Sequence, residues 1–218
     1  MSFIEIGEFG IGSGFLYMFI FTMLVVWLSL VLYSFKRYGG KKTVRYFLPM
    51  MIAALFLEAG AVSSGRYIYP GYLTHISVLG RSVPLIILLG WSANLFLFLK
   101  MSKRVVLVFY KTKNLIRIVL ISLLAGLFGV CLDLLEDPIA HHNNWWMWTE
   151  SVTEASFYGV PFSNFFDWFI ILFYMALATQ LIERSSYSEN RKLLISFFSI
   201  SFIGVAIFIT HSLFVQFI

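Results

Sequence analysis

Charged side chains and cysteine are scarce in this sequence. Asp, Glu, Lys and Arg make up only 12% of its 218 residues, whereas 60% are hydrophobic and 19% aromatic. An ordinary soluble domain has about 25% charged residues, so the composition excludes that class and indicates an integral membrane protein. The single cysteine, Cys131, lies within an apolar run and has no second cysteine with which to form a disulfide in the chain.

Several signatures of common chemistries are also missing. The sequence has no Gly-rich phosphate loop, no Asp-rich diphosphate motif and no serine elbow. The net charge of +5 does not indicate a nucleic-acid partner, because the basic residues fall in short loops between apolar runs, where membrane anchoring explains them. The adjacent His141 and His142 lack the i, i+4 spacing of helical metal ligands, so we expect no metal.

Six long apolar runs dominate what remains. A hydrocarbon core of about 30 Å needs about 20 apolar residues per helix. The runs that satisfy this length are roughly 15–35, 46–62, 83–99, 115–135, 161–182 and 193–217. The alternation of a membrane β-barrel is absent. The sequence therefore predicts an all-α integral membrane protein, a bundle of about six transmembrane helices in one domain over 1–218, with an outer-face loop region at about 134–160.

The positions of Lys and Arg predict the orientation of this bundle. The loops after the first, third and fifth runs hold nearly all of the basic residues, and only Arg66 and Arg81 fall on the other side. Cytoplasmic loops carry an excess of Lys and Arg. We therefore expect both termini outside, in a multi-pass protein of the cell membrane.

Polar residues in the runs fall mainly in the predicted outer half of the bundle. A rise of about 1.5 Å per residue brings polar groups from five elements to this region, namely Glu58, Asn94, Asp133, Asn164, Asp167 and His211. We expect no equivalent set in the inner half, where Thr179 and Gln180 are nearly alone. Because ionisable groups within a membrane usually face the bundle interior and mark a site, chemistry is expected in the outer half.

The carboxyl groups have competing interpretations. Glu58 is either a site residue, since its run continues beyond it, or an interface residue that reaches water. Asp133 and Asp137 are four residues apart, so they share a helical face, where each makes the other harder to ionise and one could stay protonated. Alternatively, Asp137 and the proline after it end the helix. Three further acids are expected to be solvated loop residues, namely Glu136, Glu150 and Glu154.

The tryptophans and His211 also have structural alternatives. Trp145, Trp146 and Trp148 are close together near a predicted membrane interface, where aromatic residues commonly form a belt. His211 is either a hydrogen-bonded core residue or a member of the site.

Two stretches of the sequence resemble a known family. The run 58–91, EAGAVSSGRYIYPGYLTHISVLGRSVPLIILLGW, contains a Glu, Gly-x-Tyr-x-Tyr and Val-Pro…Trp pattern. The second stretch contains Asp133, Asp137-Pro138, Trp146-x-Trp148 and Tyr158-Gly159-Val160-Pro161-x-x-Asn164. Both patterns resemble the membrane carotenoid biosynthesis hydratases, which include the gamma-carotene hydratases of bacteria and the bisanhydrobacterioruberin hydratases of haloarchaea.

This resemblance implies cofactor-free addition of water to the terminal trisubstituted double bond of an acyclic carotenoid, which gives a tertiary alcohol. Such a reaction needs a neutral acid in a dry site, and Glu58 or one of Asp133 and Asp137 is the candidate. Asn164, Asp167 or the remaining carboxylate would hold the water. The residues expected to bind the substrate or face its cation are Tyr67, Tyr69, Trp91, Asn94, Trp146, Trp148, Tyr158 and His211.

Two other functions remain open at this stage. A membrane cyclase would use the same protonation and aromatic groups, but an internal double bond would capture the cation in place of water. A small non-catalytic membrane binder or transporter would use the buried acids to carry protons or cations. If the protein is a hydratase or a cyclase, its expected partners are a lipophilic isoprenoid or carotenoid and the lipid bilayer.

Overall fold

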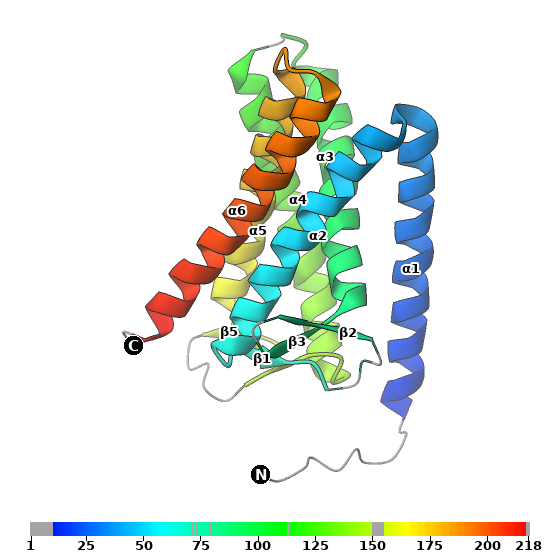
Figure 1. The fold of residues 1–218 in the computed structure, drawn as a ribbon. Helices are drawn as coiled ribbons and strands as arrows, with labels where there is room; N and C mark the ends of the chain where they lie inside the picture. Colours follow the sequence, from blue (N-terminus) through cyan, green and yellow to red (C-terminus); the bar gives the residue numbers. More distant parts are fainter. Residues whose placement is uncertain are drawn as a thin grey trace.

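Six long helices make up most of the protein. The computed structural model describes residues 11–70, 72, 74–78, 80–112, 114–149 and 155–216, without the side chains of 11–13, 207, 208 and 210–216. The helices run side by side along one axis (Figure 1). They are α1 (Ile11–Tyr38), α2 (Gly40–Ser63), α3 (Leu85–Phe109), α4 (Leu115–His142), α5 (Phe162–Arg184) and α6 (Glu189–Gln216). The prediction of an all-α membrane bundle is therefore confirmed.

The helices have the length and apolarity that a membrane requires. Among the described residues, the apolar spans in α1 to α5 are 23 to 28 residues long and have mean hydropathies of 1.6 to 2.6, enough to cross a bilayer. The start of α1 and the end of α6 lie at the same end of the bundle (Figure 1). We call this the outer end, after the predicted orientation, and the opposite end, where Gly39 joins α1 to α2, the inner end.

Helices α2 to α6 form the packed bundle, and small residues let them approach closely. A Cβ added at Gly204 of α6 would lie 2.6 Å from the Cα of Ala53 in α2, and one at Gly126 of α4 would lie 2.9 Å from the Phe169 carbonyl oxygen in α5. Such contacts stabilise helix pairs in membranes, where burial of apolar surface adds little. Helix α1 packs on the outside of α2 and α3 and is almost entirely exposed to the surroundings.

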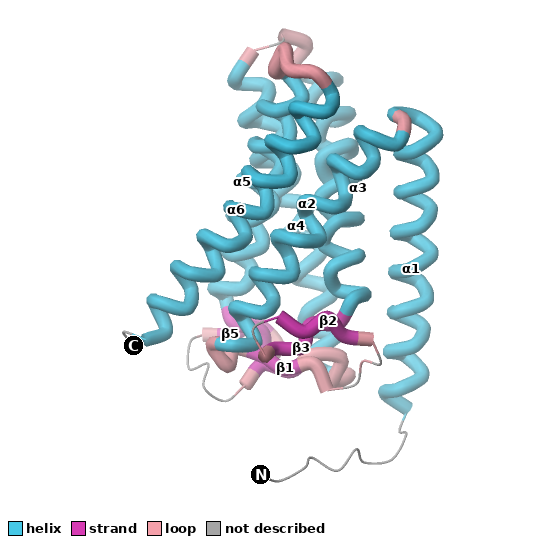
Figure 2. Tube along the Cα trace, in the orientation of Figure 1, coloured by secondary structure: helices cyan, strands magenta, loops and turns pink. Residues whose placement is uncertain are grey.

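Short strands gather at the outer end, between the helices. Figure 2 shows them as a layer across the ends of the bundle. They form three antiparallel pairs: β1 (Tyr67–Ile68) with β4 (Met147–Trp148), β2 (His75–Val78) with β3 (Arg81–Pro84), and β5 (Ser156–Phe157) with β6 (Val160–Pro161). Helices α3 and α5 both begin directly after a strand, and in each the N-cap residue is a proline.

Helix α4 differs from its expected form at the outer end. It does not end at Asp137 but continues through Pro138 to His142, so the outer-face segment begins at Asn143. His141 and His142 lie in its last turn and not in a loop. Pro138 cannot donate the backbone bond to the Leu134 carbonyl, but this loss of one bond does not end α4, which continues for about one more turn. Asp133, Glu136 and Asp137 are therefore all helical.

The inner end also differs from expectation. A buried polar cluster lies there, built from Arg45, Tyr46, Lys100, Lys103 and Glu183. The expectation of a nearly apolar inner half is wrong because basic residues counted as loop residues belong to helices and turn their side chains into the bundle.

Candidate functional site

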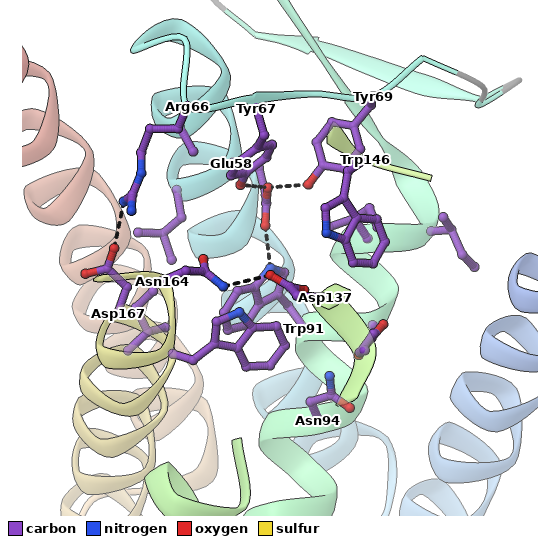
Figure 3. A pocket seen from close by; sticks show the side chains of 18 of the residues that line it. Glu58, Arg66, Tyr67, Tyr69, Trp91, Asn94, Asp137, Trp146, Asn164 and Asp167 are labelled. Carbon is purple, nitrogen blue, oxygen red and sulfur yellow. Dashed lines mark hydrogen bonds and ion pairs between the residues drawn. The ribbon is translucent and has the colours of Figure 1, made fainter. Parts of the chain in front are cut away.

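A cavity near the outer end collects most of the predicted site residues. Including the open space at its mouth, it has a volume of about 920 Å³. All five helices α1 to α5 contribute to its wall, together with β1 and the segment around β4. Its polar and aromatic lining residues include the ten that are labelled in Figure 3, namely Glu58, Arg66, Tyr67, Tyr69, Trp91, Asn94, Asp137, Trp146, Asn164 and Asp167. Glu136, Trp148 and Trp168 line the cavity as well. We call this the outer cavity.

Glu58 is buried in the wall of the outer cavity and is surrounded by donors. The hydroxyls of Tyr67 and Tyr69 both donate to its Oε2, the latter at 2.6 Å, and the Trp91 indole Nε1 donates to its Oε1 at 2.6 Å. Figure 3 shows the three donors converging on the carboxyl from α3 and from the segment that follows α2. All of these partners are donors, so both oxygens of Glu58 act as acceptors, which is the hydrogen-bonding role of a carboxylate.

The two tyrosines keep their protons in this environment. Burial raises the pKa of Tyr67 and Tyr69 well above its ordinary value, and the nearby Glu58 adds to the shift. Their hydroxyls therefore remain donors throughout the physiological pH range. The Gly-x-Tyr-x-Tyr pattern thus supplies two fixed donors for the glutamate that precedes it in the sequence.

A second acidic group lies across the cavity, between α4 and α5. Asp133 and Asp137 follow one another on the buried face of α4, and both are nearly inaccessible. The Asn164 Nδ2 atom donates to Asp137 Oδ2 at 2.7 Å and to the Asp133 oxygens at 3.0 and 3.2 Å. Trp146 also donates to Asp137. We call Asp133, Asp137 and Asn164 the carboxyl cluster.

The two carboxyl groups lie side by side, because one Asn164 amide nitrogen reaches both of them. Two buried carboxylates at such a separation repel one another, which favours a proton on one of them. Asp137 lines the outer cavity, whereas Asp133 lies behind it and is fully buried.

An ion pair lies at the rim of the outer cavity. Arg66 Nη1 is 2.8 Å from Asp167 Oδ2, and Arg66 Nη2 donates to the Ser163 hydroxyl at 2.5 Å. The guanidinium also lies 5.6 Å from the centre of the Trp148 ring. Arg66 thus connects the segment after α2 with the first turn of α5. The charge of Asp167 is balanced there, and its side chain is 39% exposed.

Aromatic rings form much of the remaining wall. Trp91 stacks on Trp168 with ring centres 4.2 Å apart, and Tyr69 lies edge-on to Trp146 at 6.3 Å. Phe19 of α1 contacts Trp146 at 5.9 Å and so closes the side of the cavity that faces α1. Electron-rich faces therefore surround the space between Glu58 and the carboxyl cluster.

The two sequence patterns meet at this site. Strand β1 carries Tyr67 and pairs with β4, so that Tyr67 lies opposite Trp148. The turn between β5 and β6 has positive φ angles at Tyr158 (50°) and Gly159 (82°), as a tight two-residue hairpin requires. The hairpin leads directly into α5, whose first turn carries Asn164. The patterns thus contain both cavity residues and the turns that position them.

Not every predicted site residue lies in the cavity. Tyr158 does not line it: the side chain is 77% exposed, because its position in the turn directs it outward. The side chain of His211 lies outside the described residues, as do Glu150 and Glu154. Asn94 lines the cavity deeper in the bundle, and no hydrogen-bond partner for its amide is found in the described part of the chain.

The cavity wall also contains residues that were not predicted, among them Glu136, Arg66 and Trp168. Glu136 was expected to be a solvated loop residue, but it belongs to α4 and is half-buried in the lining. Neither Arg66 nor Trp168 was predicted from the sequence as a site residue. The spacing of Trp168, four residues after Asn164 and therefore on the same face of a helix, is a signal that could have found it. Among the described residues, no three His, Cys, Asp or Glu side chains are placed to hold one metal ion.

Gly159 provides a test of the hairpin. A Cβ there would lie 2.6 Å from the His141 ring and would also be strained by the positive φ. We expect Gly159→Ala to lower the free energy of unfolding by more than the ~1–2 kcal/mol of backbone strain alone. Gly39→Ala is the matched control, because Gly39 has φ of 80° and open space around it. Equal losses for both variants in detergent unfolding would contradict the close approach to His141.

The fold and site define a class: a multi-pass helical membrane protein with buried carboxyl groups in an aromatic cavity. Comparison with protein families gives a more specific result. The profile of the carotenoid biosynthesis protein family matches residues 14–218, nearly the whole chain, and the chain belongs to this family. No curated protein and no solved structure matches it. A role in carotenoid biosynthesis follows, with a lipophilic isoprenoid substrate and a lipid environment.

Proposed function

We propose that the protein is a hydratase that adds water to the terminal trisubstituted double bond of an acyclic carotenoid or related isoprenoid. The observation that carries this proposal is the carboxyl cluster, in which Asn164 holds two buried acids side by side at the wall of an aromatic cavity. Alkenes are weak bases, so their protonation needs a carboxylic acid kept neutral and away from water. The family supports the substrate class but not the particular reaction.

Asp137 is the proton donor in this proposal. It is the member of the cluster that faces the cavity, and Asp133 behind it holds the shared proton in place. The proton forms a new C–H bond at the less substituted alkene carbon and uses the π electron pair of the double bond. A tertiary cation then develops at the other carbon.

Glu58 and the aromatic walls stabilise this cation. Trp91, Trp146 and Trp168 present ring faces or edges to the cavity, and cation–π attraction contributes roughly 0.5–2 kcal/mol per ring. Glu58 is fixed by three donors, so it does not need to reorganise when positive charge appears nearby. Because Glu58 lies opposite the carboxyl cluster, the cation would form between Asp137, which has just lost its proton, and the Glu58 carboxylate.

Asn164 positions the water. Its amide nitrogen points toward the aspartates (Figure 3), which leaves its carbonyl oxygen to accept a hydrogen bond from a water molecule beside the cluster. The water oxygen forms the new C–O bond, and its surplus proton returns to the Asp133 and Asp137 pair. The cycle is therefore balanced without a cofactor.

The rest of a long polyene would remain outside the polar part of the cavity. Apolar residues of α1 and α3 line the side away from the carboxyls, among them Met23, Ile86, Ile87 and Gly90. Because α1 covers this side only from the outside of the bundle, a substrate dissolved in lipid can approach between helices. The reactive end group alone must pass to Glu58 and Asp137.

Product analysis in water enriched in heavy oxygen tests the proposal. The protein is expressed in a host that makes an acyclic carotenoid such as lycopene, and the extract is analysed by mass spectrometry. We expect a product heavier by one water molecule and carrying the label, absent from cells without the gene.

A product of unchanged mass but altered retention would instead indicate cyclisation, in which the same acid protonates the polyene and an internal double bond captures the cation. That outcome would overturn the water-binding role of Asn164. It would leave the protonation by Asp137 to be examined in the new reaction.

A further inference from the structure

A second cavity lies at the inner end of the bundle, far from the carboxyl cluster. Residues of α1, α2, α3 and α5 form its wall, and with its opening it has a volume of about 720 Å³. Four cations line it, Lys42, Lys100, Lys103 and Arg104, against one carboxylate, Glu183. We call it the inner cavity. Its charge contrasts with that of the outer cavity, where Glu58, Glu136, Asp137 and Asp167 face Arg66 alone.

Glu183 is already occupied by other partners. Lys103 Nζ lies 2.5 Å from its Oε2, the Tyr46 hydroxyl donates to its Oε1, and Arg45 approaches it at 3.7 Å. No acidic partner for Lys42 or Arg104 is found among the described residues. The carboxylate therefore neutralises the floor of the inner cavity and leaves the cations around its opening without a counter-charge.

Lys100 lines this space and is held among aromatic rings. Its Nζ atom lies 4.2 Å from the centre of the Tyr38 ring, 4.1 Å from that of Tyr46 and 5.1 Å from that of Phe96. It donates one hydrogen bond, to the Tyr46 hydroxyl at 2.9 Å. An ammonium has three N–H donors, so two lack a hydrogen-bond acceptor in the described part of the chain. Lys42 and Lys103 are close enough to repel it.

We propose that the inner cavity binds the phosphate group of an anionic phospholipid. Lys42 and Arg104, the cations without counter-charge, and the Lys100 side chain provide N–H donors that a phosphate diester accepts. The cavity opens where α1 and α3 reach the predicted cytoplasmic leaflet, which is rich in anionic lipids. Leu107 of α3 lines the cavity, is exposed and offers apolar surface to the acyl chains. This site is independent of the proposed hydration.

Lipid binding to the full-length protein tests the proposal. Protein purified in a neutral detergent is titrated with phosphatidylglycerol and, separately, with the zwitterionic phosphatidylcholine, and bound lipid is counted by native mass spectrometry. We expect phosphatidylglycerol to bind preferentially. We also expect Lys42→Ala combined with Arg104→Ala to weaken its binding about ten-fold.

Lys41→Ala combined with Lys111→Ala is the matched control. This control also removes two positive charges, but from exposed residues at the inner end that do not line the inner cavity. The control variant should therefore bind phosphatidylglycerol as the wild type does. Equal binding of the two lipids, or equal weakening by the two double variants, would overturn the site. Displacement of the lipid by millimolar glycerol phosphate would overturn the lipid source, since the site would then take a water-soluble phosphate ester.

Discussion

Asp137→Asn is expected to lower the rate of product formation by about 10²–10⁴-fold, the usual contribution of a general acid. Asparagine has nearly the same shape as aspartate and can still accept the hydrogen bonds from Asn164 and Trp146. It can also donate to Asp133, so the packing between α4 and α5 is preserved. What it lacks is the transferable proton. The measurement is the rate of conversion in isolated membranes at matched protein levels.

A control separates this effect from a general effect of removing a carboxyl. Glu189→Gln removes one at the inner end, where Glu189 pairs with Arg45 and does not touch the outer cavity. This variant should keep nearly full activity. Asp133→Asn should show an intermediate loss, because Asp137 would then have an amide neighbour in place of the acid that shares its proton. Full activity in Asp137→Asn would rule out Asp137 as the proton donor.

The depth of the polar residues could be predicted from sequence because a transmembrane helix has a constant rise. The rise per residue predicted Glu58, Asp133 and Asn164, which belong to three different helices, in the outer half of the bundle. The structure places Glu58 and Asn164 in the wall of one cavity, with Asp133 directly behind it. Counting of this kind needs helices that cross two boundary planes at a known separation, which a membrane supplies.

Connections outside the helices were harder to predict. Arg66, next to β1, reaches Asp167 of α5, and β1 itself pairs with β4 although both α3 and α4 separate these strands in the sequence. Strands of two residues carry no periodic signal. Glu136 was misplaced for another reason: a proline directly after Asp137 usually marks a helix boundary, but α4 continues through Pro138 to His142.

The exposed Tyr158 shows the limit of reasoning from a shared pattern. A pattern records which residues occur together, whether they contact the substrate or shape the backbone. In the Tyr-Gly-Val-Pro-x-x-Asn stretch, Gly159 approaches His141, Val160 is fully buried and Pro161 caps α5. Only Asn164 lines the cavity. The stretch therefore positions the Asn164 amide beside the carboxyl groups of Asp133 and Asp137.

Glu58→Gln is expected to lower the rate of product formation by about 10²–10³-fold, as is typical when one preorganised electrostatic partner of a transition state is removed. Glutamine keeps the length of the side chain but replaces the carboxylate with a neutral amide. Its NH₂ group would also face at least one of the donors Tyr67, Tyr69 and Trp91, which now point at carboxylate oxygens. Both the charge opposite the cation and the fixed geometry would be lost.

Tyr69→Phe provides the graded comparison. It leaves the carboxylate with the donors Tyr67 and Trp91 and removes one hydrogen bond, whose net value of about 1 kcal/mol corresponds to a rate loss of about five-fold. A large loss in Glu58→Gln with a small one in Tyr69→Phe would indicate that the charge of Glu58 acts on the reaction. Equal losses in the two variants, with lowered unfolding temperatures in both, would instead assign Glu58 a purely structural role. Cation stabilisation would then rest on the aromatic walls around Trp91 and Trp146 alone.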